Sequence, residues 1–420
     1  MIREYTLDNG LRILHEPLPH LHTVAVGLWM GTGSRHEEPE NGGMSHCLEH
    51  MLFKGTQHRS AAGIAREIDC LGGNINAFTS KDSTCYHTKT LSEDLPRAMD
   101  ILTDMVRYPL LETAHLELEK GVILEEIGMV EDYPEELVQD VLLEKTWEGH
   151  SLSRPILGTR DSVSAFTSER VREYHGRHYV PDNAVLSVAG EVDINRVLAY
   201  AEQYLGSWTG NASLVESEIS PVFQNTFTIA RKKTEQAHLC LAFPGVGMDE
   251  EDIWPLAVLN AILGGGMGSR LFQRVREELG LVYSVYSFPT SYRDGGLLSV
   301  YAAAAPKKAR EVLKRLAEEI GRLASEPIPE GEFTDALHQL RRGFLMGLDS
   351  TNGHMMSMGR DAIVSRRIRQ TEETLARIDA VTPAQVDAIL AHVFRGKAVG
   401  FAGVGSLTLP DSLLEQFRFH

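Results

Sequence analysis

The sequence has little cysteine, no long apolar run and no excess of positive charge, and each absence excludes a class of protein. Its four cysteines, Cys47, Cys70, Cys85 and Cys240, are too few and too irregularly spaced for a disulfide framework or a thiolate zinc site. We therefore expect a reducing, cytoplasmic location. Runs such as "AVLNAIL" are far shorter than the roughly 18 residues that cross a bilayer, so we expect no membrane span, and the charged start "MIREYTLDNG" predicts no signal peptide.

The charge and composition that remain are those of a large globular protein. A formal net charge of −17 argues against nucleic-acid binding. The 43% hydrophobic and 24% charged content predicts a well-packed core rather than a disordered or fibrous chain. A chain of 420 residues is long enough for two cores of roughly 200 residues each.

Two parts of the sequence match each other at a constant spacing of 215 residues. The match pairs Thr167 with Thr382 and Gly190 with Gly405. Threonine is a good helix N-cap and glycine can close a strand, so a helix followed by a buried strand is expected at both places. The polar segment "TGNASLVESEISPVFQNTF" separates the two halves. The predicted parts are residues 1–212, a linker at 213–230, and residues 231–420.

Each half is predicted to have an α+β fold. Strand-like runs such as "HTVAVGLWM" and "AHLCLAFPGV" come first, and helices of 12 to 25 residues then mix with short β runs. Strands and helices do not alternate strictly, which favours two homologous α/β sandwiches, each a mixed, largely antiparallel sheet with helices on one face. Together they would form a clamshell. A doubly wound parallel sheet is the less favoured alternative.

The segment "MSHCLEHMLFKGT" contains His46, Glu49 and His50. On a helix, the two histidines lie about 40° apart around the axis, so both imidazoles can reach one ion. Glu49 falls near the same face and suits a base that touches metal-bound water better than a third ligand. With 17 histidines in the chain, an accidental HxxEH motif has a chance on the order of a few per cent. An ordinary helix surface therefore stays open as an alternative.

A third ligand is available in "LELEKGVILEEIGMVEDYPEE", which is predicted to be one long helix. Glu119 and Glu126 are seven residues apart and share a face, whereas Glu125 points away. A catalytic zinc site needs a third protein ligand and one open position, which this face can supply. Taken alone, acidic residues on a helix more often form a solvated surface.

The HxxEH order, followed 76 residues after His50 by Glu126 in "VILEEI", resembles the inverted-motif zinc peptidases: pitrilysin, insulinase and the mitochondrial processing peptidase. The resemblance covers nearly the whole chain and includes "GGNINAFTSKDSTCYHTK", "HYVPDNAVLSVAGEV" and "LGGGMGSRLFQRVREELGLVYSV". The length and the two-half layout are similar to those of the small bacterial members, which are related to the processing peptidase β subunit.

The resemblance implies a role for each residue of the motif. His46, His50 and Glu126 would bind one Zn2+ per chain, and Glu49 would be the general base that activates the zinc-bound water. Glu119 would be the neighbouring carboxylate that holds a ligating histidine in its tautomer.

The resemblance also implies substrate-binding residues. Asn76, Ala77 and Phe78 would lie on an edge strand that binds the peptide backbone by strand addition, although the pattern alone indicates an ordinary hairpin. Arg276 and Tyr283 would contact the substrate, with the tyrosine hydroxyl near the developing oxyanion. Without the resemblance, Arg276 would be read as a helix-surface charge and Tyr283 as a core or strand residue.

The second half cannot repeat the zinc site. Aligning Leu52 with Leu263 places Ala257, Asn260 and Ala261 at the positions of the HxxEH residues. We therefore expect a first, catalytic half and a second half that clamps the substrate.

The function expected is that of a zinc metalloendopeptidase that hydrolyses peptides or unfolded segments in an enclosed chamber. Because a chamber needs about four such half-units, a homodimer is expected. The alternative is a non-catalytic scaffold or partner subunit of a processing-peptidase-like complex.

Overall fold

The computed structural model describes residues 1–212, 220–248, 250–395 and 398–419, which divide into two compact units. The predicted linker, 213–230, lies partly outside the described residues. Each unit also contains one segment from the other half of the sequence. Unit 1 consists of Met1–Ile127, Arg154–Glu216 and Leu345–Thr371, and unit 2 consists of Gly128–Ser153, Ser217–Phe344 and Glu372–His420.

Unit 1 contains a six-stranded sheet, sheet 1, in the order β1-β2-β6-β3-β5-β4. All neighbouring strands are antiparallel except β2 and β6, which are parallel. The expected mixed, largely antiparallel sheet is therefore present. The strands are β1 (Arg3–Thr6), β2 (Arg12–Pro17), β3 (Thr23–Met30), β4 (Asn74–Thr79), β5 (Thr84–Leu91) and β6 (Ala184–Gly190).

Unit 2 contains a five-stranded sheet, sheet 2, in the order β7-β11-β8-β10-β9. Only β7 and β11 are parallel. This order repeats β2-β6-β3-β5-β4 of sheet 1, so the duplication read from the sequence is confirmed at the level of topology. The strands are β7 (Thr226–Ala230), β8 (Ala237–Pro244), β9 (Val282–Tyr292), β10 (Gly295–Ala304) and β11 (Gly400–Val404).

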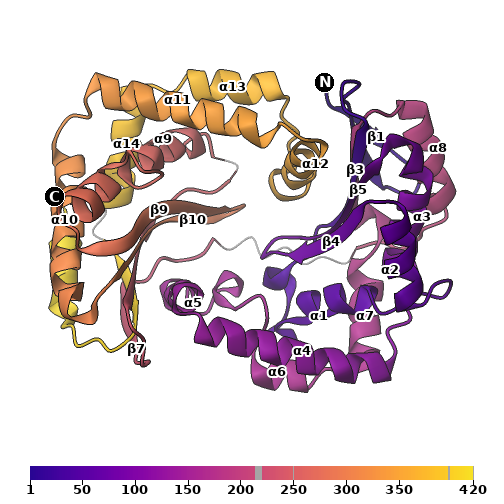
Figure 1. The fold of residues 1–420 in the computed structure, drawn as a ribbon, viewed down its shortest axis with the longest axis horizontal. Helices are drawn as coiled ribbons and strands as arrows, with labels where there is room; N and C mark the ends of the chain where they lie inside the picture. Colours follow the sequence, from indigo (N-terminus) through magenta and orange to yellow (C-terminus); the bar gives the residue numbers. More distant parts are fainter. Residues whose placement is uncertain (213–219, 249, 396–397, 420) are drawn as a thin grey trace. The chain divides into compact units, whose positions relative to one another are not determined.

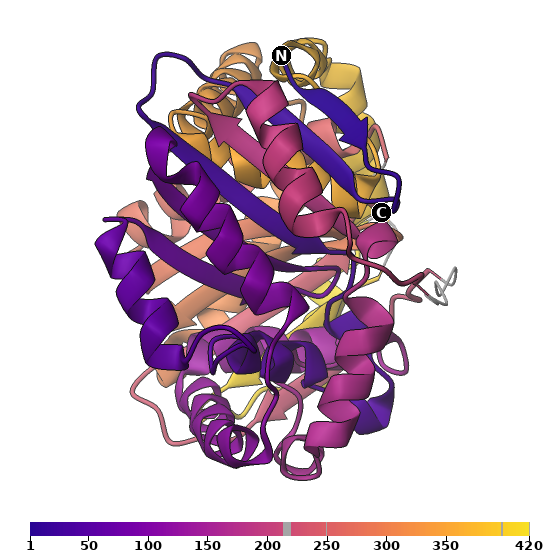
Figure 2. The ribbon, with the colours of Figure 1, turned by 90° about the vertical axis from the view of Figure 1, so that its right-hand side faces the viewer.

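The helices of unit 1 cover both faces of sheet 1. α2, α3 and α8 lie on one face and α12 on the other (Figure 1), and Figure 2 views the first of these faces. Alternate residues of β3 serve the two faces: Val24 and Val26 pack with the first set of helices, whereas Ala25 and Trp29 pack with α12. The helices are α1 (Met44–Leu52), α2 (Ala61–Cys70), α3 (Leu95–Arg107), α4 (Thr113–Asp132), α6 (Arg160–Ser164), α7 (Ser168–His178), α8 (Ile194–Leu205) and α12 (Thr351–Arg360).

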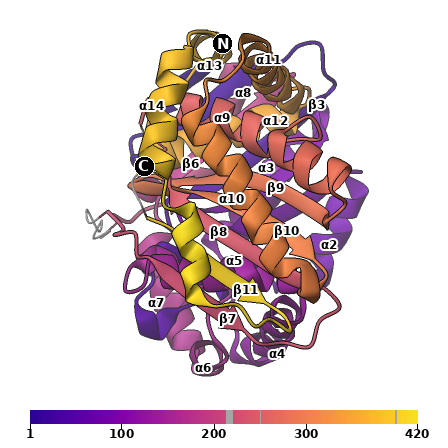
Figure 3. The ribbon, with the colours of Figure 1, turned by 90° about the vertical axis from the view of Figure 1, so that its left-hand side faces the viewer.

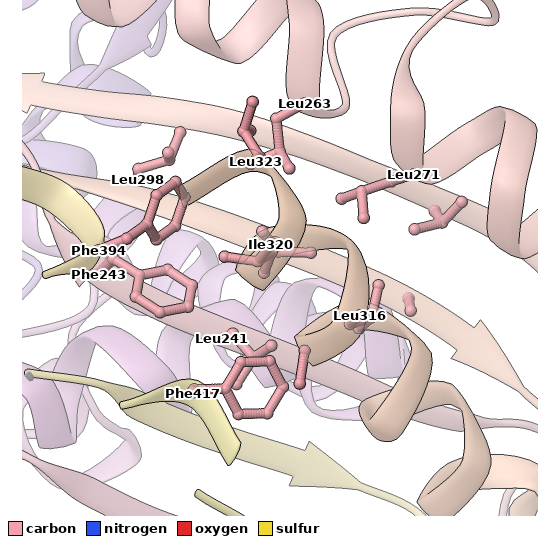
Figure 4. Close-up of a cluster of buried hydrophobic side chains, with 14 of the residues drawn as sticks. Leu241, Phe243, Leu263, Leu271, Leu298, Leu316, Ile320, Leu323, Phe394 and Phe417 are labelled. Atoms are coloured by element: carbon pink, nitrogen blue, oxygen red, sulfur yellow. The ribbon is translucent and has the colours of Figure 1, made fainter. Parts of the chain in front are cut away.

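The helices of unit 2 are arranged in the same way around sheet 2. α9, α10 and α14 cover one face (Figure 3), and α5 packs on the other. The main core lies under α10, where Ile320 and Leu316 meet Phe243 and Phe394, whose ring centroids are 4.9 Å apart (Figure 4). The helices are α5 (Pro134–Thr146), α9 (Ile253–Leu263), α10 (Ala309–Ser325), α11 (Glu330–Gly347), α13 (Thr371–Asp379) and α14 (Pro383–Phe394).

Each sheet thus receives a helix from the other half of the sequence. α5 comes from the first half and packs in unit 2, and α12 comes from the second half and packs in unit 1. The expectation of helices on one face of each sheet holds for the helices that come from the same half of the sequence as the sheet. The exchanged helix covers the opposite face, which explains why β3 is almost wholly buried.

The residues that revealed the repeat have the same structural roles in both units. Thr167 and Thr382 are the N-caps of α7 and α14, and the side chain of each accepts a main-chain N–H from the residue three positions on. Gly190 ends β6 with φ 150°, and Gly405 follows β11 with φ 135°. Both glycines occupy a backbone conformation that other residues rarely adopt, so these positions match for a physical reason.

None of the described helices is long and apolar enough to span a membrane. Cys47, Cys70, Cys85 and Cys240 are free thiols.

Candidate metal centre

Helix α1 presents the HxxEH motif on one side. Met44, Cys47, Leu48 and Met51 are buried in the core of unit 1, so the other side of the helix carries the polar residues of the motif. α1 packs against β4 and α7, and α4 lies beside it in the same unit (Figure 1). These contacts fix the direction in which the motif residues point.

The donor atoms of His46, His50 and Glu126 lie within 4.8 Å of one another. Glu126 Oε2 is 3.7 Å from His46 Nε2 and 3.6 Å from His50 Nε2. Three ligands of a tetrahedral zinc ion with bonds of about 2.1 Å are about 3.4 Å apart, so this set fits the ion. Among the described residues it is the one group of His, Cys, Asp or Glu side chains that could hold a metal.

The state of His46 suits a ligand. Burial, with a smaller contribution from the neighbouring His50, lowers the pKa of His46 to about 4. The imidazole is therefore neutral near pH 7 and has a lone pair to offer. The side chains of His46, His50 and Glu126 are 13%, 18% and 33% exposed, so the site is reachable from solvent on one side.

Glu119 lies behind His50 on the same face of α4 as Glu126. Its side chain is 7% exposed, and its Oε2 lies 3.0 Å from His50 Nδ1. When Nδ1–H donates to this carboxylate, the Nε2 lone pair of His50 is directed at the ion position. Glu125, by contrast, is exposed.

Lys54 holds the other oxygen of Glu119 and was not identified from the sequence. Its Nζ is 2.7 Å from Glu119 Oε1, so a buried carboxylate has both a hydrogen-bond donor and a compensating charge. Lys54 lies two residues beyond the end of α1, where no helical spacing connects it to Glu119. Its position follows from tertiary packing.

Glu49 has a partner that sequence reasoning also missed. Its Oε2 accepts a hydrogen bond of 2.5 Å from Thr79 Oγ1. Burial raises the pKa of Glu49, and although the Thr79 bond and His50 oppose this effect, the net shift is upward. A carboxylate whose pKa is raised toward neutrality is suited to accept a proton and to return it.

The predicted substrate residues lie on β4, the edge strand of sheet 1. The N–H of Ala77 donates to Asn76 Oδ1 (2.8 Å), so this donor of the edge strand is bonded to a side chain of its own strand. Phe78 packs its ring against Trp29, with centroids 5.5 Å apart. Since β4 ends at Thr79, the edge strand leads directly to the partner of Glu49.

Arg276 and Tyr283 belong to unit 2. Arg276 lies in a π-helix, Phe272–Glu278, a form often found at functional sites. Its guanidinium carbon is 4.5 Å from the ring centroid of Phe272 and 5.6 Å from that of Tyr283. Tyr283 lies in β9 and is 73% exposed, so of the two readings from the pattern alone, core or strand residue, the strand reading holds and the core reading is wrong.

The counterpart of α1 in unit 2 is α9, which ends at Leu263, the residue aligned with Leu52 at the end of α1. It carries Ala257, Asn260 and Ala261 in place of the HxxEH residues. Asn260 Oδ1 accepts a hydrogen bond of 2.7 Å from Ser287 on β9. Unit 2 therefore keeps a link between this helix and the edge strand but has no metal ligands at the equivalent place.

Comparison with known proteins identifies the family. Residues 12–160 match the family described as Insulinase (Peptidase family M16), and residues 165–340 match the Peptidase M16 inactive domain. An uncharacterized zinc protease of Bacillus subtilis is 40% identical over 394 residues, which cover 94% of this chain and 96% of that protein. The chain belongs to peptidase family M16. The resemblance inferred from the motif is thereby confirmed.

Two solved structures have the same M16 fold. A protease from Helicobacter pylori has a TM-score of 0.92 at 19% identity, covering 96% of this chain and 99% of its own. A Pseudomonas fluorescens protein described as a peptidase M16 inactive domain has a TM-score of 0.90 at 20% identity, covering 97% and 98%. At these identities the likeness shows the fold, and the case for M16 chemistry rests on the metal centre itself.

Proposed function

We propose that this protein is a zinc-dependent metalloendopeptidase. The observation that carries the proposal is the convergence of three donor atoms, from His46, His50 and Glu126, within 4.8 Å, beside a carboxylate on the same helix. The names of relatives as zinc proteases support the choice of metal and of reaction.

Each residue of the centre has a task in peptide hydrolysis. When bound, zinc supplies a Lewis acid that polarises the scissile carbonyl and lowers the pKa of a coordinated water. Glu49 takes the proton of the attacking water and delivers it to the leaving amine. Glu119 keeps His50 in the tautomer that leaves Nε2 free, and Thr79 limits the rotation of the Glu49 carboxylate.

The edge strand β4 is proposed to bind the substrate backbone. A carbonyl oxygen of a peptide that adds to this edge would accept the hydrogen bond from Ala77 N–H that Asn76 Oδ1 accepts in the free protein. Main-chain bonds do not distinguish side chains, so the sequence preference should be loose. Arg276 and Tyr283 are proposed to contact the substrate from unit 2, with the Tyr283 hydroxyl as a donor to the oxyanion.

The proposal extends to assembly. Two chains together would supply four units of this fold, which is enough to enclose peptides or unfolded segments in a chamber, so we propose a homodimer with two active sites. Mass measurement in solution tests the oligomeric state independently of activity.

The experiment that tests the function is hydrolysis of a quenched fluorescent peptide of about ten residues by purified protein. We expect wild type to cleave the peptide, a chelator to abolish cleavage, and added zinc to restore it. The Glu49→Gln variant should not cleave the peptide but should still bind about one zinc per chain. No cleavage of several peptides by zinc-loaded wild type would reject the proposal in favour of a scaffold or partner subunit.

A matched pair of variants tests the ligand assignment. Glu126→Gln should lose bound zinc, whereas Glu125→Gln, an adjacent and exposed position on α4, should keep it. Loss of zinc from Glu125→Gln alone would show that the wrong carboxylate has been assigned.

A further inference from the structure

Helix α1 has no N-cap side chain of its own. It spans nine residues, Met44–Leu52, a length at which an isolated helix is marginal in water. Its N-cap is Gly43, which has φ 90° and cannot offer a capping oxygen. The main-chain N–H groups of its first turn therefore need acceptors from elsewhere in the molecule.

Glu37 supplies two acceptors at this end of the helix. Its Oε2 accepts the N–H of Gly43 and its Oε1 accepts the N–H of Ser45, both at 2.7 Å. The side chain is almost wholly buried, at 4% exposure, and its carboxyl group lies at the positive end of the helix, which favours the ionised form. We propose that Glu37 is a positioning residue of the metal centre, which fixes the start of α1 and so the placement of the proposed ligands; this inference rests on the proposed function.

The surroundings of Glu37 make its position rigid. The guanidinium of Arg154 donates to the main-chain oxygen of Glu37. A Cβ at Gly43 would lie 2.5 Å from the oxygen of Leu157, so this turn is pressed against a neighbouring loop. Ser45 Oγ lies 2.8 Å from the Tyr174 hydroxyl of α7, which ties the same turn to a second helix. The carboxylate is held as firmly as the helix that it caps.

The duplicated fold provides an internal comparison. In α9, the N–H groups of Ile253 and Trp254 donate to the main-chain oxygens of Glu250 and Glu251, and the third position is Pro255, which has no N–H. The helix without metal ligands thus begins by local main-chain bonds. A buried carboxylate from outside the helix is found at the start of α1, where ligand geometry matters.

The link from Glu37 to the metal centre is short. Ser45, which donates to Glu37, is followed directly by His46, and Glu49 and His50 lie one turn further on. Functional groups must be held to within roughly half an ångström to act together. Fraying of the first turn would move His46 first and would lower metal affinity before it unfolds the domain.

The test compares Glu37→Gln with Glu38→Gln in the full-length protein. Glu38 is the adjacent residue and is exposed, so it is a matched control. Burial raises the pKa of Glu37 to about 7, although the hydrogen bonds from the two N–H groups act to lower it. The measurements are therefore made at pH 8, where the carboxylate is ionised. In Glu37→Gln, a single amide oxygen replaces two acceptors, and the NH2 group faces an N–H donor.

Three readouts are needed. In the metal-free protein, deuterium exchange of the peptide that covers residues 41–52 should be at least tenfold faster in Glu37→Gln than in wild type or Glu38→Gln. The zinc dissociation constant should rise at least tenfold. The absorption spectrum of the cobalt-substituted protein should change in Glu37→Gln and not in Glu38→Gln. A residue that matters only for overall stability would not change this spectrum.

The outcomes are decisive in both directions. Exchange and zinc affinity within twofold of wild type in folded Glu37→Gln would overturn the proposal. If that variant does not fold, Glu37→Asp, which keeps the charge on a shorter side chain, takes its place. It should bind zinc more weakly and exchange faster at residues 41–52 than wild type, and properties equal to those of wild type would overturn the proposal. If zinc-loaded wild type cleaves no peptide, the proposed function fails, but exchange and zinc affinity still decide the role of Glu37.

Discussion

Replacing Glu119 by glutamine should weaken zinc binding about 10- to 100-fold without unfolding the protein. Both carboxylate oxygens of Glu119 are used, one by His50 Nδ1 at 3.0 Å and one by Lys54 Nζ at 2.7 Å. Glutamine keeps the size but has one acceptor oxygen, so one of these two donors loses its partner. A hydrogen bond to a charged group contributes about 1.5–3 kcal/mol, and about 1.4 kcal/mol corresponds to a tenfold change in affinity. The estimate agrees with the usual effect of changing a residue behind a metal ligand.

The assay for Glu119→Gln is competition for zinc against a chromogenic chelator, with circular dichroism to show that the variant is folded. Glu117→Gln is the matched control, because Glu117 lies two residues away on α4, where its exposed side chain pairs with Lys120 at 2.7 Å. Zinc affinity of Glu119→Gln within twofold of wild type would refute the argument that this carboxylate orients His50. An equal loss in Glu117→Gln would show that the effect comes from the charge of the helix.

Three further predictions follow from the contacts described above. Thr79→Val should lower kcat about tenfold with KM within about twofold, because Glu49 loses its bond, and Thr79→Ser should restore the rate; equal rates in both variants would contradict this role. Tyr283→Phe should lower kcat by roughly ten- to a thousandfold if its hydroxyl serves the oxyanion, and an unchanged rate would remove it from the mechanism. Burial raises the pKa of Asp104, but bonds from Thr56, His58 and Arg59 outweigh this and lower it. The ionised Asp104 carboxylate therefore stabilises the fold fully above about pH 4, and this stabilisation is lost as the pH falls through the lower folded pKa. Asp104→Asn should lower the free energy of unfolding by about 3 kcal/mol at pH 7, and denaturant melts at lower pH should show a smaller difference between the variant and wild type. A difference in unfolding free energy that does not change with pH would count against the pairing.

Local helical geometry brought the candidate ligands to notice in the sequence, and the family resemblance then assigned Glu126 as the third of them. A spacing of four residues brings His46 and His50 to one side of a helix, and a spacing of seven does the same for Glu119 and Glu126. Both spacings hold in α1 and α4 as the structure has them. The duplication could also be read from matched caps and glycines, whereas the strand order that the two sheets share is seen only in the structure.

The residues that surround the ligands could not be found in this way. Glu37, Lys54 and Thr79 reach the centre through a turn, a loop and an edge strand, and no periodicity connects these segments to α1 or α4. The exchange of α5 and α12 between the units is equally invisible in the sequence, because the residue pattern of a helix does not indicate which sheet the helix covers. These features depend on tertiary packing, which a single sequence does not encode in any local pattern.

The two units show which parts of the centre come from the fold and which come from substitution. In unit 2, Asn260 on α9 bonds to a hydroxyl of the edge strand, as Glu49 on α1 does in unit 1. The fold therefore supplies the link between helix and edge strand in both places, and the change from amide to carboxylate supplies the group that can accept a proton. Among the described residues, the histidine pair of the motif and the Glu37 cap occur together on α1, which is consistent with a metal centre that uses both its ligands and a firmly held helix. If this reasoning is correct, placing histidines at Ala257 and Ala261 alone should produce a weaker metal site than the one on α1, because the N-cap of α9, Asp252, makes no side-chain capping bond of the kind that Glu37 makes at the start of α1.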